Sequence, residues 1–224
     1  MQGAIAALRA LHITAGVLAL AVCALPLASR KGGRLHRRSG AVYAWAMFSA
    51  AVTALGVVPL RLLSTRSAAV RSRSVFLGYV AVLSFTSCFY GYRVLGQKGR
   101  REPHRALVDR AVPSALLVAS GGIALYGVVT HFPLGYLFAP LGVLVATGQL
   151  RAMASVPTAR NWWLIEHLRA MLVATIGTLT AFLVQNTLRV LPHAGVWPWL
   201  VPTLLGVPAM ILWRRRYERV APTP

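Results

Sequence analysis

The stretch that decides the fold is AIAALRALHITAGVLALAVCALPLA, residues 4–28, followed at once by the basic run SRKGGRLHRR, residues 29–38. A helix that crosses a bilayer needs about 20 mostly apolar residues, each adding about 1.5 Å. Residues 4–28 meet that requirement. Short loops rich in Lys and Arg remain on the cytoplasmic side. The apolar stretch and the basic run together therefore predict a membrane-spanning helix that ends in the cytoplasm.

Six more stretches have the same character, and they lie roughly at 40–63, 75–95, 106–130, 134–154, 164–188 and 197–213. The chain is 57% hydrophobic and 12% charged, whereas a soluble domain is usually about a quarter charged. The sequence therefore predicts an all-α integral membrane protein, a seven-transmembrane helix bundle that forms one polytopic domain over residues 1–224. The lipid bilayer is its expected environment.

The net charge of +20 would suggest nucleic acid in a soluble protein, but here the positive residues collect in alternate loops. The positive-inside rule then places the N-terminus outside and the C-terminus in the cytoplasm, and no nucleic-acid partner is expected. One loop, at 61–74, breaks the rule because its four arginines fall on the predicted outer face. The inner residues are Arg30, Lys31, Arg34, Arg37, Arg38, Arg93, Lys98, Arg100, Arg101, Arg105, Arg151, Arg160, Arg214, Arg215, Arg216 and Arg219.

Two inner loops resemble each other: SRKGGRLHR at 29–37 and QKGRREPHR at 97–105. Each follows an apolar stretch and precedes the next one. This similarity predicts a duplicated helical hairpin in the first four spans, as in many membrane folds with internal repeats. The alternative is that both are ordinary basic inner loops.

Three of the four acidic residues lie close to a histidine: Glu102 and Asp109 near His104, and Glu166 beside His167. Ionisable groups in an apolar chain are costly unless they are paired or used. Local pairing is one explanation, with Asp109 bound to Arg105, Glu166 to Arg169, and Glu102 to an arginine of its own loop.

The alternative to local pairing is a functional site that includes the histidines. The predicted topology gathers His36, His104 and His167 near the cytoplasmic helix ends, with His12 in the outer half. His12 and His36 also each precede a glycine by one turn, at Gly16 and Gly40. Such a glycine clears space for a haem ligated by the imidazole, or for another helix, and we favour helix packing at both.

Three functions remain open. The leading hypothesis is a membrane redox protein that binds b-type haem or a transition metal, with two of His36, His104 and His167 as ligands, or His12 on the outer side. The second is a small-molecule or ion transporter or channel, and the third an intramembrane hydrolase with zinc on His36, His104, His167 and Asp109. Polar residues that would line a transport path are Thr53, Tyr79, Thr86, Tyr90, Ser120, Gln149, Gln185 and Asn186. A homo-oligomer or a membrane-complex partner fits each hypothesis.

The runs LHITAG (11–16), KGGRLHRRSGAVY (31–43), HLRAM (167–171) and TAFLVQN (180–186) resemble a bacterial family of predicted membrane proteins catalogued as domain of unknown function 2306. The resemblance covers the first two spans and part of the sixth. It implies a multi-pass protein of the bacterial inner membrane. It brings no substrate and no catalytic residues.

Overall fold

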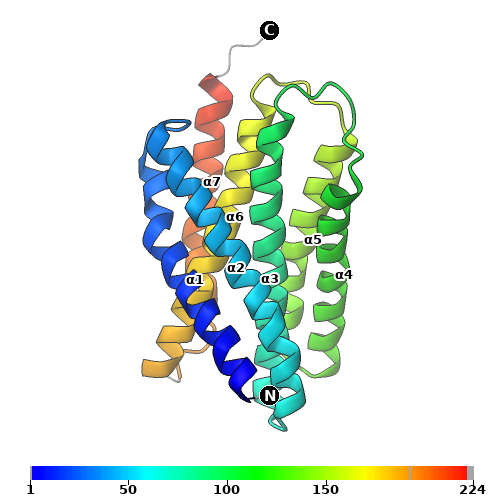
Figure 1. Ribbon diagram of the computed structural model, residues 1–224. Helices are drawn as coiled ribbons and strands as arrows, with labels where there is room; N and C mark the ends of the chain where they lie inside the picture. The colour runs from blue at the N-terminus through cyan, green and yellow to red at the C-terminus, as the bar shows by residue number, and fades with distance from the viewer. Residues whose placement is uncertain (1, 192, 221–224) are drawn as a thin grey trace. The chain divides into compact units, whose positions relative to one another are not determined.

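The computed structural model describes residues 2–191 and 193–220, and within these ranges the chain is entirely helical, with seven α-helices, one 3₁₀ turn and no strand (Figure 1). All seven apolar stretches lie in helices, so the all-helical prediction is confirmed. The elements are α1 (Gln2–Ala28), α2 (Arg34–Ser64), α3 (Ala68–Arg93), η1 (Val94–Gln97), α4 (Leu107–Val129), α5 (Pro133–Ala154), α6 (Trp162–Val190) and α7 (Trp197–Val220).

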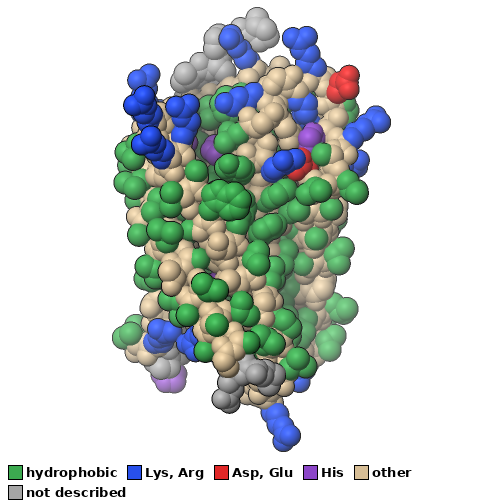
Figure 2. All heavy atoms as spheres, viewed as in Figure 1, with side chains coloured by type: hydrophobic (Ala, Val, Ile, Leu, Met, Phe, Trp, Pro, Cys, Tyr) green, Lys and Arg blue, Asp and Glu red, His purple; other side chains and the backbone are tan. Residues whose placement is uncertain are grey.

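Six of the helices described, α1 to α6, are long and apolar enough to cross a membrane, which is the architecture of an integral membrane protein. Helix α7 is not among them, because Pro202, Pro208 and its basic end at Arg214–Arg216 lower its apolar character. Large apolar side chains such as Val118, Leu144 and Leu205 are at least 70% exposed in the middle of their helices. Figure 2 shows hydrophobic side chains along the visible faces of the helices. Such faces suit contact with lipid.

Two helices begin earlier than predicted. Helix α2 starts at Arg34 rather than near residue 40, and α3 starts at Ala68 rather than near 75. The predicted loop at 61–74 is wrong as a result, since only Thr65, Arg66 and Ser67 separate α2 from α3. Arginine is a good helix former, so a helix need not stop where the apolar run stops.

The chain divides into two compact units, whose boundaries run through α3, α4 and α5. The first comprises Met1–Phe85 and Gly121–Ala139, and the second comprises Thr86–Ser120 and Pro140–Pro224.

In the first unit, α1 packs along α2, with Ala19 fully buried and the methyl groups of Leu8 against Gly56 (Figure 1). The end of α4 meets the start of α5 so closely that a Cβ on Gly135 would lie 2.7 Å from the carbonyl oxygen of Ile123. Glycine is therefore required there, as small residues are wherever membrane helices approach closely. The Tyr79 hydroxyl donates to the carbonyl oxygen of Phe138 at 2.9 Å.

In the second unit, glycines again mark the closest helix contacts. A Cβ on Gly91 of α3 would lie 2.8 Å from the sulfur of Met171 in α6, and one on Gly206 of α7 would lie 2.5 Å from Ile176 of α6. The Asn161 amide also donates to the carbonyl oxygen of Tyr217 at 3.0 Å. The start of α6 is therefore held against the ends of α3 and α7.

Candidate functional site

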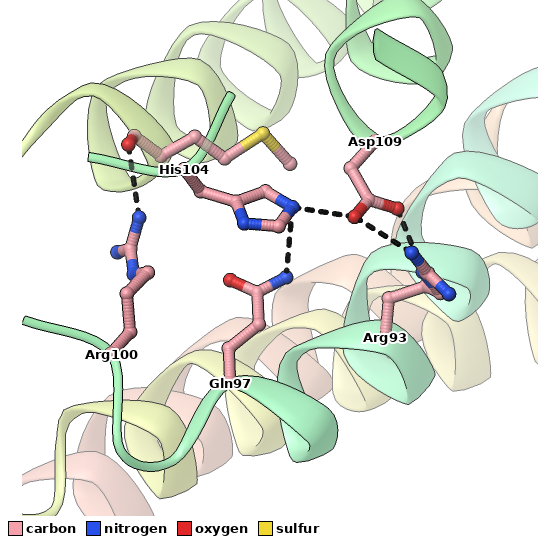
Figure 3. A network of polar contacts seen from close by, with 6 residues as sticks. Arg93, Gln97, Arg100, His104 and Asp109 are labelled. Atoms are coloured by element: carbon pink, nitrogen blue, oxygen red, sulfur yellow. Dashed lines mark hydrogen bonds and ion pairs between the residues drawn. The ribbon is translucent and has the colours of Figure 1, made fainter. Parts of the chain in front are cut away.

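The buried carboxylate of Asp109 is the centre of a polar cluster in the second unit (Figure 3). Asp109 lies in the first turn of α4 and is 1% exposed. Arg93, at the end of α3, donates from Nε to Oδ1 at 2.7 Å and from its terminal nitrogen to Oδ2 at 3.0 Å. His104 Nε2 donates to Oδ2 at 2.6 Å, and the Gln97 amide lies 3.4 Å from the same ring nitrogen. The two bonds from Arg93 make its contact with Asp109 bidentate, which is the strong geometry for an arginine and a carboxylate.

The sequence predicted only part of this cluster. His104 and Asp109 do lie together, as expected from their spacing. The predicted pairing of Asp109 with Arg105 is wrong, because Arg105 is exposed and Arg93 occupies the carboxylate. Glu102 is also exposed and forms no ion pair among the described side chains, so its predicted pairing with a loop arginine is wrong too.

The loop between η1 and α4 is fixed to the end of α5, a contact that sequence reasoning missed. The His104 amide donates to the carbonyl oxygen of Met153 at 2.8 Å. The two terminal nitrogens of Arg100 donate to the carbonyl oxygens of Met153 and Ala152 at 2.9 and 2.7 Å. These carbonyls lack partners in the last turn of a helix, and a cation there also complements the helix dipole. The Arg100 guanidinium lies over the Trp162 ring, 4.6 Å from its centroid.

Glu166 forms a second cluster, where α3 meets α6. Its Oε2 accepts from the Tyr90 hydroxyl at 2.8 Å and from Arg169 at 2.7 Å. The predicted pairing of Glu166 with Arg169 is confirmed, whereas Tyr90 was expected only to line a path. The Arg169 side chain also reaches α5, since a Cβ on Gly148 would lie 3.4 Å from its terminal nitrogen.

Each of the other three candidate histidines gives its Nδ1 hydrogen to a backbone carbonyl of another helix. His12 donates to Ala50 at 2.8 Å, His36 to Pro26 at 3.0 Å and His167 to Gly91 at 2.7 Å. A carbonyl can only accept, so the neutral rings carry their lone pair on Nε2. This is the orientation that ligating histidines take, but it is also a satisfactory structural contact.

The geometry limits which histidines can share a metal. His36 contacts Pro26, which lies 14 residues after His12 on α1, so about 21 Å of helix separates the two rings. They do not meet at one iron. Among the described residues, no three His, Cys, Asp or Glu side chains lie close enough to hold a metal ion. The structure thus joins His104 to Asp109 and does not join the four predicted zinc ligands.

The two His-x-x-x-Gly patterns are not packing contacts within the described chain. A Cβ on Gly16 or on Gly40 would meet nothing within 4 Å. Our preference for helix packing at these glycines is therefore wrong for contacts inside one chain, and both positions face open space.

Several of the polar residues predicted to line a path are buried inside protein. Tyr79, Thr86, Tyr90, Ser120 and Gln149 are at most 4% exposed, whereas Asn186 is exposed. In the second unit, Ser87 Oγ and Gln149 Oε1 are buried without a hydrogen-bond partner among the described residues. Such groups are rare in native structures and usually contact water or a ligand.

Six helices long and apolar enough to cross a membrane indicate the class: a polytopic α-helical membrane protein. Comparisons with protein-family models, curated proteins and solved structures found no match to the chain. Its function is therefore inferred from its own residues.

Proposed function

We propose that the chain is a small proton-conducting transporter or channel of the bacterial inner membrane. In this proposal it spans the membrane seven times, including α7, with the N-terminus outside and the C-terminus in the cytoplasm. The duplicated hairpin of the first four spans belongs to the same proposal. In each of the two similar loops a cation donates to the last carbonyls of a helix, but the helices are not equivalent, since Lys31 contacts the preceding helix α1 and Arg100 contacts α5.

The observation that carries the function is the buried polar line of the second unit. Glu166 and Tyr90 lie where α3, α5 and α6 converge, and Arg169 reaches Gly148, the neighbour of Gln149. Ser87 precedes Arg93 on α3 and lies about 9 Å from it along the helix axis, towards the middle of the helix. The Ser87 hydroxyl and the Gln149 amide oxygen have no partner among the described residues, and each can accept a hydrogen bond from water. Buried acids, histidines and ordered water form the proton relays of membrane transporters.

Glu166 is better suited than Asp109 to exchange the proton. All three hydrogen bonds to the Asp109 carboxylate come from an arginine or a histidine, and such donors favour the charged form of a carboxylate. Both hydrogen bonds of Glu166 end on Oε2. Glu166 also lines a hollow of about 260 Å³ at the protein surface, which supplies access for water. We assign Glu166 as the residue that takes up and releases the proton, and Asp109 as a positioning residue.

The test is proton flux into liposomes that contain the purified full-length chain and a pH-sensitive dye, driven by a potassium diffusion potential. We expect flux above that of protein-free liposomes, and a loss of about tenfold or more for Glu166→Gln. The matched control is Glu102→Gln, which removes an exposed acid from the same unit and should leave flux unchanged. Flux equal to that of empty liposomes, or equal losses in both variants, would overturn the proposal.

Haem binding at His12 is the second candidate function. The observation in its favour is that the His12–Ala50 hydrogen bond directs the lone pair to Nε2, while Gly16, one turn away, faces open space. Haem-sufficient expression should then give a Soret band that His12→Ala abolishes and His131→Ala leaves intact. A colourless protein rules this candidate out without affecting the proton-flux test.

A further inference from the structure

A hollow in the second unit lies between the end of α5 and the start of α6, and it has a mixed lining. Its volume is about 260 Å³. Polar groups come from Arg100, Ser155, Thr158 and Asn161, and apolar groups from Val156, Pro157, Ile165 and Trp162. Val156 is 51% exposed, so the apolar part of the hollow is open to the surroundings. A lining of this kind fits an amphiphile rather than a purely polar solute.

Arg100 gives the hollow its charge. Its two terminal nitrogens bind backbone carbonyls, but its Nε is buried and has no acceptor among the described residues. Burial lowers the pKa of the Arg100 guanidinium, so a nearby anion would compensate for the lost hydration. Glu166 also lines the hollow, but Arg169 and Tyr90 already engage its carboxylate. The partners of Arg100 are neutral carbonyls, so its positive charge beside the hollow has no ion-pair partner among the described residues.

The surroundings place this hollow at the depth of lipid headgroups. Trp162 and Trp163 open α6, and tryptophan is enriched where the apolar core of a membrane meets the headgroups. Lys98 lies over the Trp163 ring, 4.3 Å from its centroid, beside the Arg100–Trp162 pair. Basic pockets at helix ends on the cytoplasmic side are a common form of anionic-lipid site.

We propose that this hollow binds the phosphate of an anionic phospholipid headgroup, with the hydroxyls of Ser155 and Thr158 as donors and the positive charge of Arg100 attracting the phosphate. The acyl chains then leave along Val156 and Ile165. This hollow is the one that Glu166 borders, but the lipid proposal is tested by lipid retention and not by proton flux, so the two proposals can fail separately.

The experiment measures lipid bound to the full-length protein in nanodiscs or mild detergent by native mass spectrometry. The lipids compared are phosphatidylglycerol and phosphatidylcholine. We expect phosphatidylglycerol to be retained preferentially, with a loss of about tenfold in Arg100→Gln, since the positive charge beside the phosphate is removed. Arg101→Gln removes an exposed arginine from the same loop and should change retention little.

Because Arg100 also holds the end of α5, Arg100→Gln alone could act through misfolding. Ser155→Trp therefore provides a second variant, which fills the hollow from an exposed position and leaves Arg100 in place. Loss in both Arg100→Gln and Ser155→Trp supports the proposal. Equal loss in Arg100→Gln and Arg101→Gln, no preference between the two lipids, or displacement of phosphatidylglycerol by millimolar inorganic phosphate would overturn a headgroup site.

Discussion

Replacing Arg93 with glutamine should destabilise the protein more than replacing its partner Asp109 with asparagine. Asp109 is 1% exposed, while the Arg93 side chain is 50% exposed. Without Arg93, the buried carboxylate retains only His104, and leaving a buried charge without its ionic partner costs about 3–5 kcal/mol. Without the carboxylate, Arg93 can turn towards water, so Asp109→Asn should cost only about 1–3 kcal/mol for the hydrogen bonds lost.

The double variant separates coupling from two independent losses. Arg93→Gln with Asp109→Asn should be about as stable as Asp109→Asn alone, because a neutral amide no longer needs a cation beside it. The assay is reversible unfolding of the full chain in mixed micelles, followed by circular dichroism. Arg110→Gln, an exposed arginine next to Asp109, is the control and should leave the unfolding free energy unchanged. Additive single effects, or a larger loss for Asp109→Asn than for Arg93→Gln, would refute this account of the pair.

Three further predictions use the same unfolding assay. Gly135→Ala should cost about 1–3 kcal/mol, because the new Cβ would lie 2.7 Å from a backbone oxygen, whereas Gly122→Ala on α4 meets nothing within 4 Å and should be neutral. Tyr90→Phe should cost about 1 kcal/mol through the lost hydrogen bond to Glu166, and no loss would mean that Arg169 alone satisfies the carboxylate. Lys31→Met should cost about 0.5–1.5 kcal/mol because Nζ binds the carbonyls of Pro26 and Leu27 at 2.8 and 2.7 Å, and an equal loss in Arg30→Met would contradict that reason.

The helices were predictable because the thickness of a bilayer sets the length of an apolar run. The ends of the helices were less predictable. Backbone hydrogen bonding and the helix propensity of arginine extend α2 back to Arg34 and α3 back to Ala68, across residues that a hydropathy pattern assigns to loops. The part of α2 that precedes Gly40 was therefore not predicted.

The site was predictable where its contacts are local. His104 and Asp109 are five residues apart, and Glu166 and Arg169 are three apart on one helix face. The Arg93–Asp109 and Tyr90–Glu166 contacts join residues 16 and 76 positions apart, across helices whose rotation no single sequence pattern specifies. The local rule instead selected Arg105 for Asp109, since it could not detect that Arg105 faces outward.

Asp109 and Glu166, the two ion-paired acids of the second unit, are therefore separable by experiment. Asp109 joins α3 to α4 through two oxygens that are both occupied, so its loss should appear first as lost stability. Glu166 joins α3 to α6 through one oxygen and borders a hollow, so Glu166→Gln can keep both hydrogen bonds on its amide oxygen while losing the proton-accepting carboxylate. If conduction is the function, Glu166→Gln should lose flux with little loss of stability. A variant that loses both in proportion would instead show that Glu166, like Asp109, only holds helices together.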